Sequence, residues 1–248
     1  MKERRLFIGC AGWSIPASEK TSFPKHGSHL QRYATQFTAV EINSSFYRPH
    51  RGATYARWAE TAGDDFRFSV KAPRTITHEA KLRPDPLDVE RFVTEINHLG
   101  AKLGCMLVQF PPSLRWEPLA GREFFETLRK WIVAPIACEP RHKSWFTDEV
   151  EKVLTEFYIS RVVADPCLVA GGEIPGGWTS FVYYRLHGSP RTYYSTYDTD
   201  YLASLTRTIQ KHIKAKQTCW CIFDNTAAGA ASRNALDLLA QITGVGVQ

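Results

Sequence analysis

Short apolar runs alternate with longer amphipathic segments along the whole sequence, and this alternation is the feature that most restricts the fold. Eight runs have the length and composition of buried strands: Leu6–Cys10, Ala39–Ile42, Phe66–Lys71, Met106–Phe110, Ile136–Glu139, Arg161–Ala164, Phe181–Leu186 and Trp220–Phe223. Seven further segments have helical patterns: His29–Thr35, Thr54–Thr61, Asp85–Leu99, Glu123–Ile132, Asp148–Phe157, Tyr201–Ile213 and Ala227–Ile242. Strands that alternate with helices predict βαβ units and a parallel sheet.

The sixth strand is the exception, because no helical segment follows it. Residues 165–179 are rich in Gly and Pro and predict an irregular loop in place of that helix. Eight βα units close naturally into a (β/α)8 barrel, and 248 residues is a usual length for one. The alternative is a doubly wound open sheet, which would usually carry a Gly-rich phosphate loop where this chain has Gly9-Cys10-Ala11-Gly12-Trp13. We therefore predict an α/β protein, a TIM-type barrel formed by one domain over residues 1–248.

Composition limits the location and the partners of the protein. Hydrophobic residues make up 44% of the chain, yet no apolar run approaches the roughly 20 residues that span a bilayer. The charged stretch Met1–Arg5 leads to Trp13 and Pro16 instead of the apolar region of a secretion signal. We expect a cytoplasmic protein with no membrane partner. The net charge of +6 favours anionic partners, although the basic residues are spread along the chain.

The six cysteines predict buried thiols and no disulfide framework. None belongs to a C-x-x-C motif, and most lie in apolar segments. Cys219 and Cys221 should lie on one face of a strand, with Trp220 on the other. A structural metal site there would need two further ligands, and the nearby sequence offers none.

Polar and ionisable residues gather at the carboxyl ends of the predicted strands, where the loops of a barrel carry the active site. In chain order they are Glu41, Asn43, Tyr47, Lys71, His78, Gln109, Glu139, Arg141, Asp165, Arg185, His187, Asp224 and Asn225. The opposite strand ends show no such pattern, since Ala39, Met106, Ile136 and Phe181 are apolar. Charged groups so close to a barrel mouth are costly unless they are paired or bound to something. We expect these side chains to converge, either as a polar pocket or as a network of ion pairs that closes the barrel.

Seven ordered segments resemble the signature of the YecE-like family, also called the domain of unknown function 72 family. They are GCAGWS, FTAVEINSSFYR, FSVKAPRTITH, VQFPPSL, CEPRHKSW, YYRLHG and FDNTAAGAASRNA, which together extend from Gly9 to Asn234. The resemblance implies a TIM-type barrel and no established reaction. It also implies shared polar positions, here Asn43, Tyr47, Lys71, His78, Gln109, Glu139, Arg141, Arg185, His187 and Asn225.

The chain departs from the family pattern at two places. Many relatives have Thr-Ser where this chain has Cys10-Ala11, so a hydroxyl is missing from the first loop. Many have Asn-Asn where this chain has Asp224-Asn225. The second departure adds a carboxylate and is expected to change the charge of the site.

We expect the catalytic groups to be His187, Glu139 and Asp165. His187 would transfer a proton, and Glu139 would orient or assist it. Glu139 and Asp165 together leave glycosidase-type chemistry open. The cationic residues expected to hold an anionic substrate are Lys71, Arg141 and Arg185.

The remaining candidates are expected to bind substrate: Asn43, Tyr47, Gln109, Asn225, Trp13, Trp145, His78, Glu41 and Asp224. The aromatic members could stack on a base or a sugar, or simply roof the barrel. We predict no metal and no cofactor, because His187 is the only histidine at a strand end and the nearby cations would repel a metal ion.

Two functions fit these features. The first is a cofactor-free hydrolase or lyase that acts on an anionic substrate, such as one that carries phosphate. The second is a non-catalytic protein that binds nucleic acid or a nucleotide at the basic, aromatic barrel mouth. The second would show an affinity that falls steeply with salt.

Overall fold

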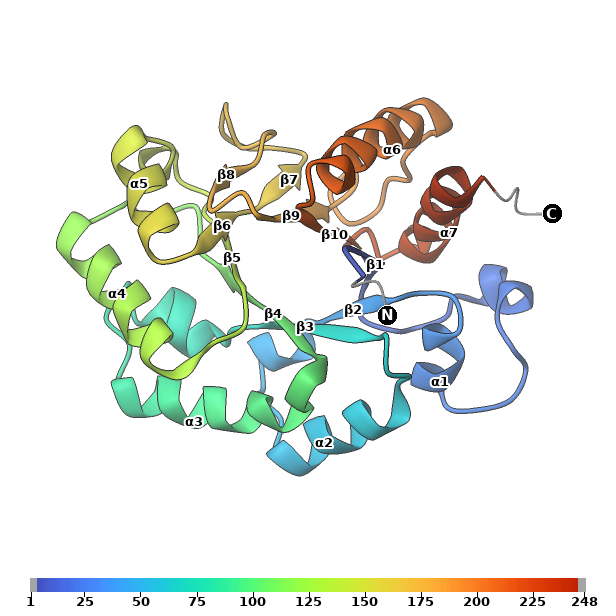
Figure 1. Cartoon of the computed structure of the whole chain (residues 1–248), viewed down its shortest axis with the longest axis horizontal. Coiled ribbons are helices and arrows are strands. Elements are labelled where there is room, and N and C mark those ends of the chain that lie inside the picture. The colour runs from blue at the N-terminus through green and yellow to red at the C-terminus, as the bar shows by residue number, and fades with distance from the viewer. Residues whose placement is uncertain (1–3, 245–248) are drawn as a thin grey trace.

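A computed structural model describes residues 4–244 and shows a ring of strands inside a ring of helices (Figure 1). The strands are β1 Leu6–Ala11, β2 Ala39–Ile42, β3 Arg67–Lys71, β4 Leu103–Gln109, β5 Ile136–Glu139, β6 Ile159–Arg161, β7 Val163–Asp165, β8 Gly176–Gly177, β9 Phe181–Leu186 and β10 Thr218–Phe223. Their order is β7-β9-β10-β1-β2-β3-β4-β5-β6-β8. The predicted TIM-type barrel is confirmed. Residues 1–3 and 245–248, which hold part of the charged N-terminal stretch and the ends of the predicted domain, lie outside the described residues.

The barrel closes where one predicted strand divides into two. β6 pairs with β5, whereas β7 pairs with β9, and only Val162 separates the two strands in sequence. The backbone N–H of Val162 donates to the carbonyl of Cys138 at 2.8 Å. The single strand predicted at Arg161–Ala164 is therefore longer and broken, because its two halves bond to different neighbours. The short β8 adds an antiparallel edge to β6.

Helices surround the strands in the predicted order, with some ends displaced. They are α1 His29–Ala34, α2 Gly52–Thr61, α3 Pro86–Ile96, α4 Pro118–Trp131, α5 Asp148–Glu156, α6 Thr199–Lys214 and α7 Ala230–Thr243. The hydroxyl of Thr147 accepts a hydrogen bond from the N–H of Val150, as its predicted N-cap role requires. Between β7 and β9 the described chain forms β8 and irregular loop instead of a helix, as predicted.

Short 3-10 and π-helical turns follow four of the strands and were not predicted, and a fifth follows α3 and begins within the predicted helix Asp85–Leu99. They are η1 Ala17–Ser22, η2 Ser44–Phe46, η3 Thr75–Glu79, η4 Asn97–Lys102 and η5 Lys143–Trp145. Turns of this length leave little periodic signal in a sequence. Two of them, η2 and η3, position residues at the carboxyl end of the barrel.

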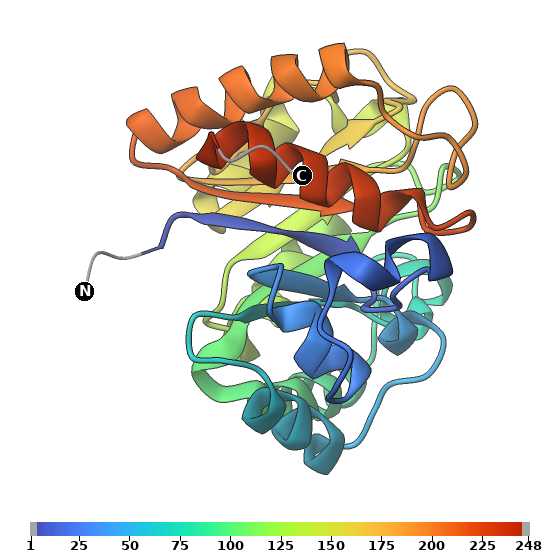
Figure 2. The same ribbon diagram turned by 90° about the vertical axis from the view of Figure 1, so that its right-hand side faces the viewer.

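Alternation along the strands separates an outer core from the barrel interior. Cys219 and Cys221 pack in the outer core between strands and helices, whereas Trp220 points into the barrel, as predicted. Inside, Trp220 stacks against Phe7 and Tyr183, with ring centroids 5.0 and 5.8 Å apart. These aromatic rings form an apolar floor inside the barrel. The parallel strands all run toward one side of the barrel, where their carboxyl ends lie (Figure 2). Within residues 4–244, no helix has the length and apolar character needed to cross a membrane.

Candidate functional site at the barrel mouth

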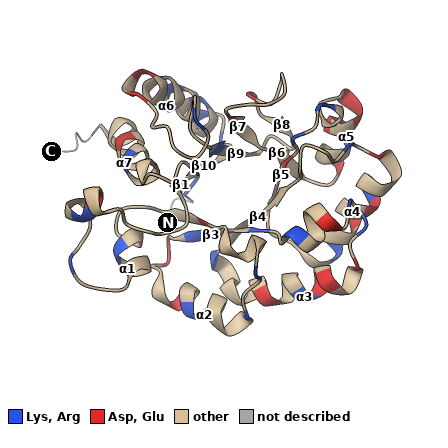
Figure 3. Cartoon of the chain, turned by 180° about the vertical axis from the view of Figure 1, so that it is seen from behind, with Lys and Arg blue, Asp and Glu red and all other residues tan. Residues whose placement is uncertain are grey.

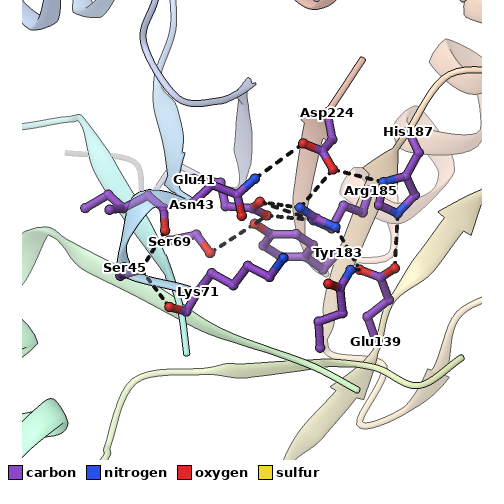
Figure 4. Close-up of polar contacts among 12 residues, drawn as sticks. Glu41, Asn43, Ser45, Ser69, Lys71, Glu139, Tyr183, Arg185, His187 and Asp224 are labelled. Carbon is purple, nitrogen blue, oxygen red and sulfur yellow. Dashed lines mark hydrogen bonds and ion pairs between the residues drawn. The ribbon is translucent and has the colours of Figure 1, made fainter. Parts of the chain in front are cut away.

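Side chains at alternate strand positions rise from the aromatic floor to the barrel mouth. On β9 and just beyond it, Tyr183, Arg185 and His187 share the inward face, because successive side chains of a strand alternate. The neighbouring strands contribute further inward residues at the same height, so groups that are far apart in the sequence meet in one cluster (Figure 4).

Arg185 lies at the centre of this cluster, and carboxylates bind every side of its guanidinium. Its Nη2 contacts Glu41 Oε1 at 2.8 Å and Asp224 Oδ2 at 2.9 Å, and its Nη1 donates to Glu139 Oε2 at 3.1 Å. The side chain is 1% exposed. Burial alone would lower the pKa of Arg185, but Asp224, Glu41 and Glu139 outweigh it and hold that pKa well above its ordinary value. Arg185 is a permanent internal cation whose guanidinium nitrogens are engaged by three carboxylates.

His187 bridges two of the same carboxylates. Its Nδ1 lies 2.9 Å from Asp224 Oδ2, and its Nε2 lies 3.0 Å from Glu139 Oε1. Burial lowers the pKa of His187, but Glu139 and Asp224 more than reverse this effect, so the pKa is raised. Since both ring nitrogens face carboxylates, the favoured form is the doubly protonated imidazolium.

Glu139 is held as an ionised carboxylate by four neighbours. Besides Arg185 and His187, it accepts hydrogen bonds from Gln109 Nε2 at 2.9 Å and from Arg141 Nε at 3.0 Å. Burial would raise the pKa of Glu139, but His187, Arg185 and Arg141 hold it well below its usual range. The predicted convergence of these residues is therefore present, and much of it takes the form of a closed ion network.

Two buried members of the network were not among the predicted site residues. The hydroxyl of Tyr183 donates to Glu41 Oε2 at 2.9 Å and lies 3.0 Å from Ser69 Oγ. Tyr183 precedes Arg185 by two positions, and Ser69 precedes Lys71 by two. That spacing is the signal that could have placed both on the inward face.

Lys71 differs from the other cations of the cluster. It ends β3 and is 7% exposed, with its Nζ 4.3 Å from the ring centroid of Phe46. Within residues 4–244, no carboxylate lies within 4.0 Å of this nitrogen. The dashed line at Lys71 in Figure 4 joins its backbone carbonyl to Ser45. Burial and the charge of Arg185 lower the pKa of Lys71 to about 8, against the opposing effect of Glu41, Glu139 and Asp224.

A cavity of about 360 Å³ opens beside Lys71. Its lining comes from the loops after β2 and β10, the loop after β9 and the network itself: Asn43, Ser44, Phe46, Tyr47, Lys71, Arg185, Tyr193, Asp224 and Thr226. A smaller hollow of about 60 Å³ is lined in part by Glu139, Arg141 and His187. Tyr193 lines the larger cavity, with its ring edge-on to His187 at 5.9 Å and its hydroxyl near Arg141.

Asn43 gives the cavity an unused acceptor. Its Nδ2 donates to Asp224 Oδ1 over a long 3.4 Å, while its Oδ1 is buried without a hydrogen-bond partner among the described residues. The opposite amide orientation would place an oxygen against the Asp224 carboxylate, so the assigned orientation is the favourable one. A buried unpaired acceptor is costly, and a ligand that donates to it would remove that cost.

Two other predicted residues lie at the rim. Tyr47 is 78% exposed and lines the cavity. His78 packs edge-on against Phe46 at 4.9 Å, and its Nδ1 lies 2.9 Å from Thr77 Oγ1. Partial burial lowers the pKa of His78, and the charges of Lys71 and Arg141 lower it further.

The structure places Asp165 outside the cluster. Val162 and Ala164 pack in the barrel interior, so alternation turns Asp165 outward. Its carboxylate accepts a hydrogen bond from the Tyr197 hydroxyl at 2.8 Å. This placement contradicts the expected catalytic role of Asp165. It also contradicts the glycosidase pairing of Asp165 with Glu139.

Three residues expected to bind substrate make packing or hydrogen-bond contacts within the fold. Trp145 is fully buried, stacks on Phe110 at 4.7 Å and donates from Nε1 to the carbonyl of Leu114 at 2.9 Å. Trp13 packs edge-on against Trp58 of α2 at 4.9 Å. The buried amide of Asn225 donates to the Ser195 carbonyl and to Asn234 Oδ1, both at 2.9 Å, and so fastens the loop after β9.

No three His, Cys, Asp or Glu side chains of residues 4–244 are arranged to hold a metal ion. Both ring nitrogens of His187 contact carboxylates, so neither nitrogen is available to coordinate a metal ion.

The fold and the site together define a TIM-type barrel whose mouth carries a buried ion network beside an open pocket. The profile of the family described as "Protein of unknown function DUF72" matches residues 7–246, and the chain belongs to this family. This agrees with the resemblance found in the sequence.

Individual relatives support the same assignment. The chain is 34% identical to the UPF0759 protein YecE of Escherichia coli K12 over 108 residues, which cover 44% of this chain and only 38% of that protein. The crystal structure of a DUF72 family protein from Thermotoga maritima matches with a TM-score of 0.80 and 26% identity, over 97% of this chain and 100% of the other. A xylose isomerase-like TIM barrel/4-hydroxyphenylpyruvate dioxygenase fusion protein matches with a TM-score of 0.52 and 16% identity, over 96% of this chain and 42% of the other, which supports the fold alone.

Proposed function

We propose that the barrel mouth is the active site of a hydrolase or lyase that acts, without a cofactor, on a small anionic substrate. The observation that carries this proposal is Lys71, a buried cation that faces the cavity without a carboxylate partner among residues 4–244. Buried charges are normally paired, so an unpaired one at a cavity wall marks a place for a ligand.

The charge balance of the cluster favours an anion. The carboxylates Glu41, Glu139 and Asp224 are matched by contacts from Arg185, Arg141 and His187. Lys71 is then the excess charge, and it lies at the wall of the cavity. A cavity of about 360 Å³ is within the range of small-molecule sites.

The network changes the roles expected of two residues. Arg185 is saturated by carboxylates, and His187 is held at both nitrogens, so we assign both to positioning the mouth. The polar groups that a ligand in the cavity would meet include Lys71, Asn43 and Tyr193. Arg141 lines the smaller hollow and is 22% exposed, so it remains a second cation for the substrate.

A small molecule is favoured over nucleic acid by the outer surface. Acidic and basic residues are mixed along α3, α4 and α5, where Figure 3 shows both colours on the same helices. Several of the basic residues are paired locally, as Arg91 is with Asp88 and Arg122 with Glu156. Nucleic-acid binding normally uses a continuous basic track.

Thermal unfolding with inorganic phosphate and small organic phosphates tests the proposal. A ligand at 100 times its Kd stabilises the folded state by about 2.7 kcal/mol. We expect such anions to stabilise the wild-type protein and to lose this effect in Lys71→Met. Lys152→Met removes the same charge from the exposed side of α5 and is the matched control.

Equal stabilisation of wild type and Lys71→Met would show that the anion binds elsewhere, and no stabilisation by any anion would refute the proposal. Tight, salt-sensitive binding of oligonucleotides that is unchanged in Lys71→Met would support the nucleic-acid alternative instead.

A further inference from the structure

The backbone around Lys71 holds its side chain in a fixed place. Ser45 Oγ donates to the carbonyl of Lys71 at 2.6 Å, and the N–H of Ala72 donates to the carbonyl of Leu107 at 2.8 Å. The strand end is therefore tied to η2 on one side and to β4 on the other. A side chain attached to such an anchored backbone is held in a defined position, as a functional group in a binding or catalytic site must be.

The amino group of Lys71 is not used in holding the fold, in contrast to a second shielded lysine. Lys102 donates from Nζ to the carbonyls of Ala59 and Ala62 at 2.7 and 2.6 Å. The Nζ of Lys71 instead lies over the ring of Phe46 and borders the cavity. Lys102 stabilises a helix end, whereas Lys71 presents its nitrogen to whatever enters.

We propose that Lys71 is a nucleophile that forms an imine with the carbonyl carbon of an anionic aldehyde or ketone. This inference rests on the proposed function, since it specifies the substrate class and the reaction of the same site. It also selects lyase chemistry over hydrolysis, because an imine withdraws electrons from the adjacent carbon atoms.

The surroundings favour the neutral amine that such an attack requires. Burial and Arg185 disfavour the ammonium form, while Glu41, Glu139 and Asp224 oppose them, and the pKa is lowered to about 8. At pH 8 about half of the Lys71 amines would be neutral, which is about 100-fold more than for an ordinary lysine. His78, whose pKa Lys71 helps to lower, adds no charge at that pH.

The step balances without an oxidant or a reductant. The Nζ lone pair forms a C–N bond with the carbonyl carbon, and a proton passes from nitrogen to the former carbonyl oxygen. A second proton allows that oxygen to leave as water while the nitrogen lone pair forms the C=N bond. Overall, the ammonium form of Lys71 and the carbonyl compound give a protonated imine and water.

Two neighbours complete the site for this chemistry. Asp224 lines the same cavity, and its Oδ2 is bound by Arg185 and His187. Among the described residues, its Oδ1 has only the long contact from Asn43. The Asp224 Oδ1 atom is therefore the carboxylate oxygen that can accept a proton from the bound imine. The unpaired Oδ1 of Asn43 can accept a hydrogen bond from a substrate hydroxyl. Arg141 lines the smaller hollow and would bind the anionic group of a substrate that extends into it.

Reductive trapping tests the imine. The full-length protein is incubated at pH 8 with glyceraldehyde 3-phosphate, pyruvate or uncharged glyceraldehyde, reduced with sodium cyanoborohydride, and analysed by intact mass and peptide mapping. We expect one adduct, at Lys71, that forms at least 10-fold faster than an adduct at any other lysine. The anionic probes should form this adduct faster than uncharged glyceraldehyde does. Lys102 is the internal control, because its amine is occupied by carbonyl groups.

Lys71→Arg separates the covalent role from the charge. Arginine keeps the positive charge but forms no imine, so this variant should keep stabilisation by inorganic phosphate and lose the adduct. Phosphate stabilisation of the wild type with adducts spread evenly over surface lysines would overturn the imine and leave the proposed function standing. Absence of both phosphate stabilisation and a selective adduct would overturn both proposals. A selective adduct that forms equally fast with uncharged glyceraldehyde would support the imine and refute the anionic substrate.

Discussion

Arg185 and Glu41 form a two-point ion pair inside the barrel, although 144 positions separate them in the sequence. The Nη2–Oε1 distance is 2.8 Å and the Nε–Oε2 distance is 3.0 Å, and the two side chains are 1% and 0% exposed. Their strands, β9 and β2, are separated in the sheet by β10 and β1. The pair therefore links parts of the ring that share no backbone hydrogen bonds.

Removal of the Arg185 guanidinium should lower the free energy of unfolding by more than the net contribution of its ion pairs to stability. In Arg185→Met, three buried carboxylates lose their shared partner, and an uncompensated buried charge costs about 3–5 kcal/mol. We expect a loss of that size in the free energy of unfolding, measured with urea at pH 7. A loss below about 1 kcal/mol would mean that the carboxylates relax toward solvent, contrary to their burial here.

The cluster could be anticipated because two simple rules act together. Strand ends of a parallel barrel meet at one mouth, and alternation decides which end residues face inward. Both rules hold for Glu41, Glu139, Arg185 and Asp224, which the sequence placed together. Asp165 fails the second rule, because it follows the inward Ala164 and so faces outward.

Other features depend on distances that the sequence does not encode. Trp145 follows a strand end, as a substrate-stacking residue would, yet it is buried against Phe110. Lys71 and Arg185 are both cations at strand ends, but only Arg185 is surrounded by carboxylates. The distance that each side chain spans across the ring decides which cation contacts the carboxylates. The sequence does not encode these distances, so the unpaired state of Lys71 became evident only in the structure.

The pH dependence of stability should reveal the charged state of His187. Its pKa is raised, because Glu139 and Asp224 outweigh burial. Its stabilising contribution is therefore fully present below the unfolded pKa of about 6.5 and is lost as the pH rises through the folded pKa. The difference in unfolding free energy between wild type and His187→Gln should be larger at pH 6 than at pH 9.

The same measurement at lower pH has the opposite sign. Burial raises the pKa values of Glu139 and Asp224, but their cationic neighbours overcome this and lower both. Their contribution is present above their unfolded pKa values, near 4, and is lost as the pH falls. Wild-type stability should thus peak between the acidic range, where the carboxylates are protonated, and the basic range, where His187 loses its proton.

For the His187 prediction, the contrary outcome is a difference in unfolding free energy between wild type and His187→Gln that does not change between pH 6 and pH 9. That result would refute the imidazolium assignment.

Asp224→Asn should increase anion binding at neutral pH. The substitution removes a carboxylate from the cavity wall while keeping an oxygen for Arg185. Near a protein surface, one charge at short range is worth on the order of 1 kcal/mol or more, which corresponds to roughly 5-fold tighter binding. Titration with inorganic phosphate, followed by calorimetry, measures the change. Weaker binding in this variant would show that Asp224 contributes to the anion site through protonation or geometry instead of repelling the anion.

Lys71→Met should make the protein more stable at neutral pH, although it removes the amine that we propose to be reactive. The folded pKa of Lys71 is lowered from 10.5 to about 8, chiefly by burial. The charged form is therefore a cost that is fully present below pH 8 and disappears as the pH rises toward 10.5. Removing the charged form should raise the free energy of unfolding at pH 7 by roughly 1–3 kcal/mol, a gain of the kind expected where a destabilising group serves function.

Urea unfolding of wild type and Lys71→Met at pH 7 and pH 10 measures this gain in stability, which should shrink at the higher pH. Lys152→Met on the exposed face of α5 should change stability by no more than about 0.5 kcal/mol. If Lys71→Met is instead destabilised at pH 7, the Phe46 ring and the nearby carboxylates stabilise the ammonium form, and Lys71 is a structural cation of the network.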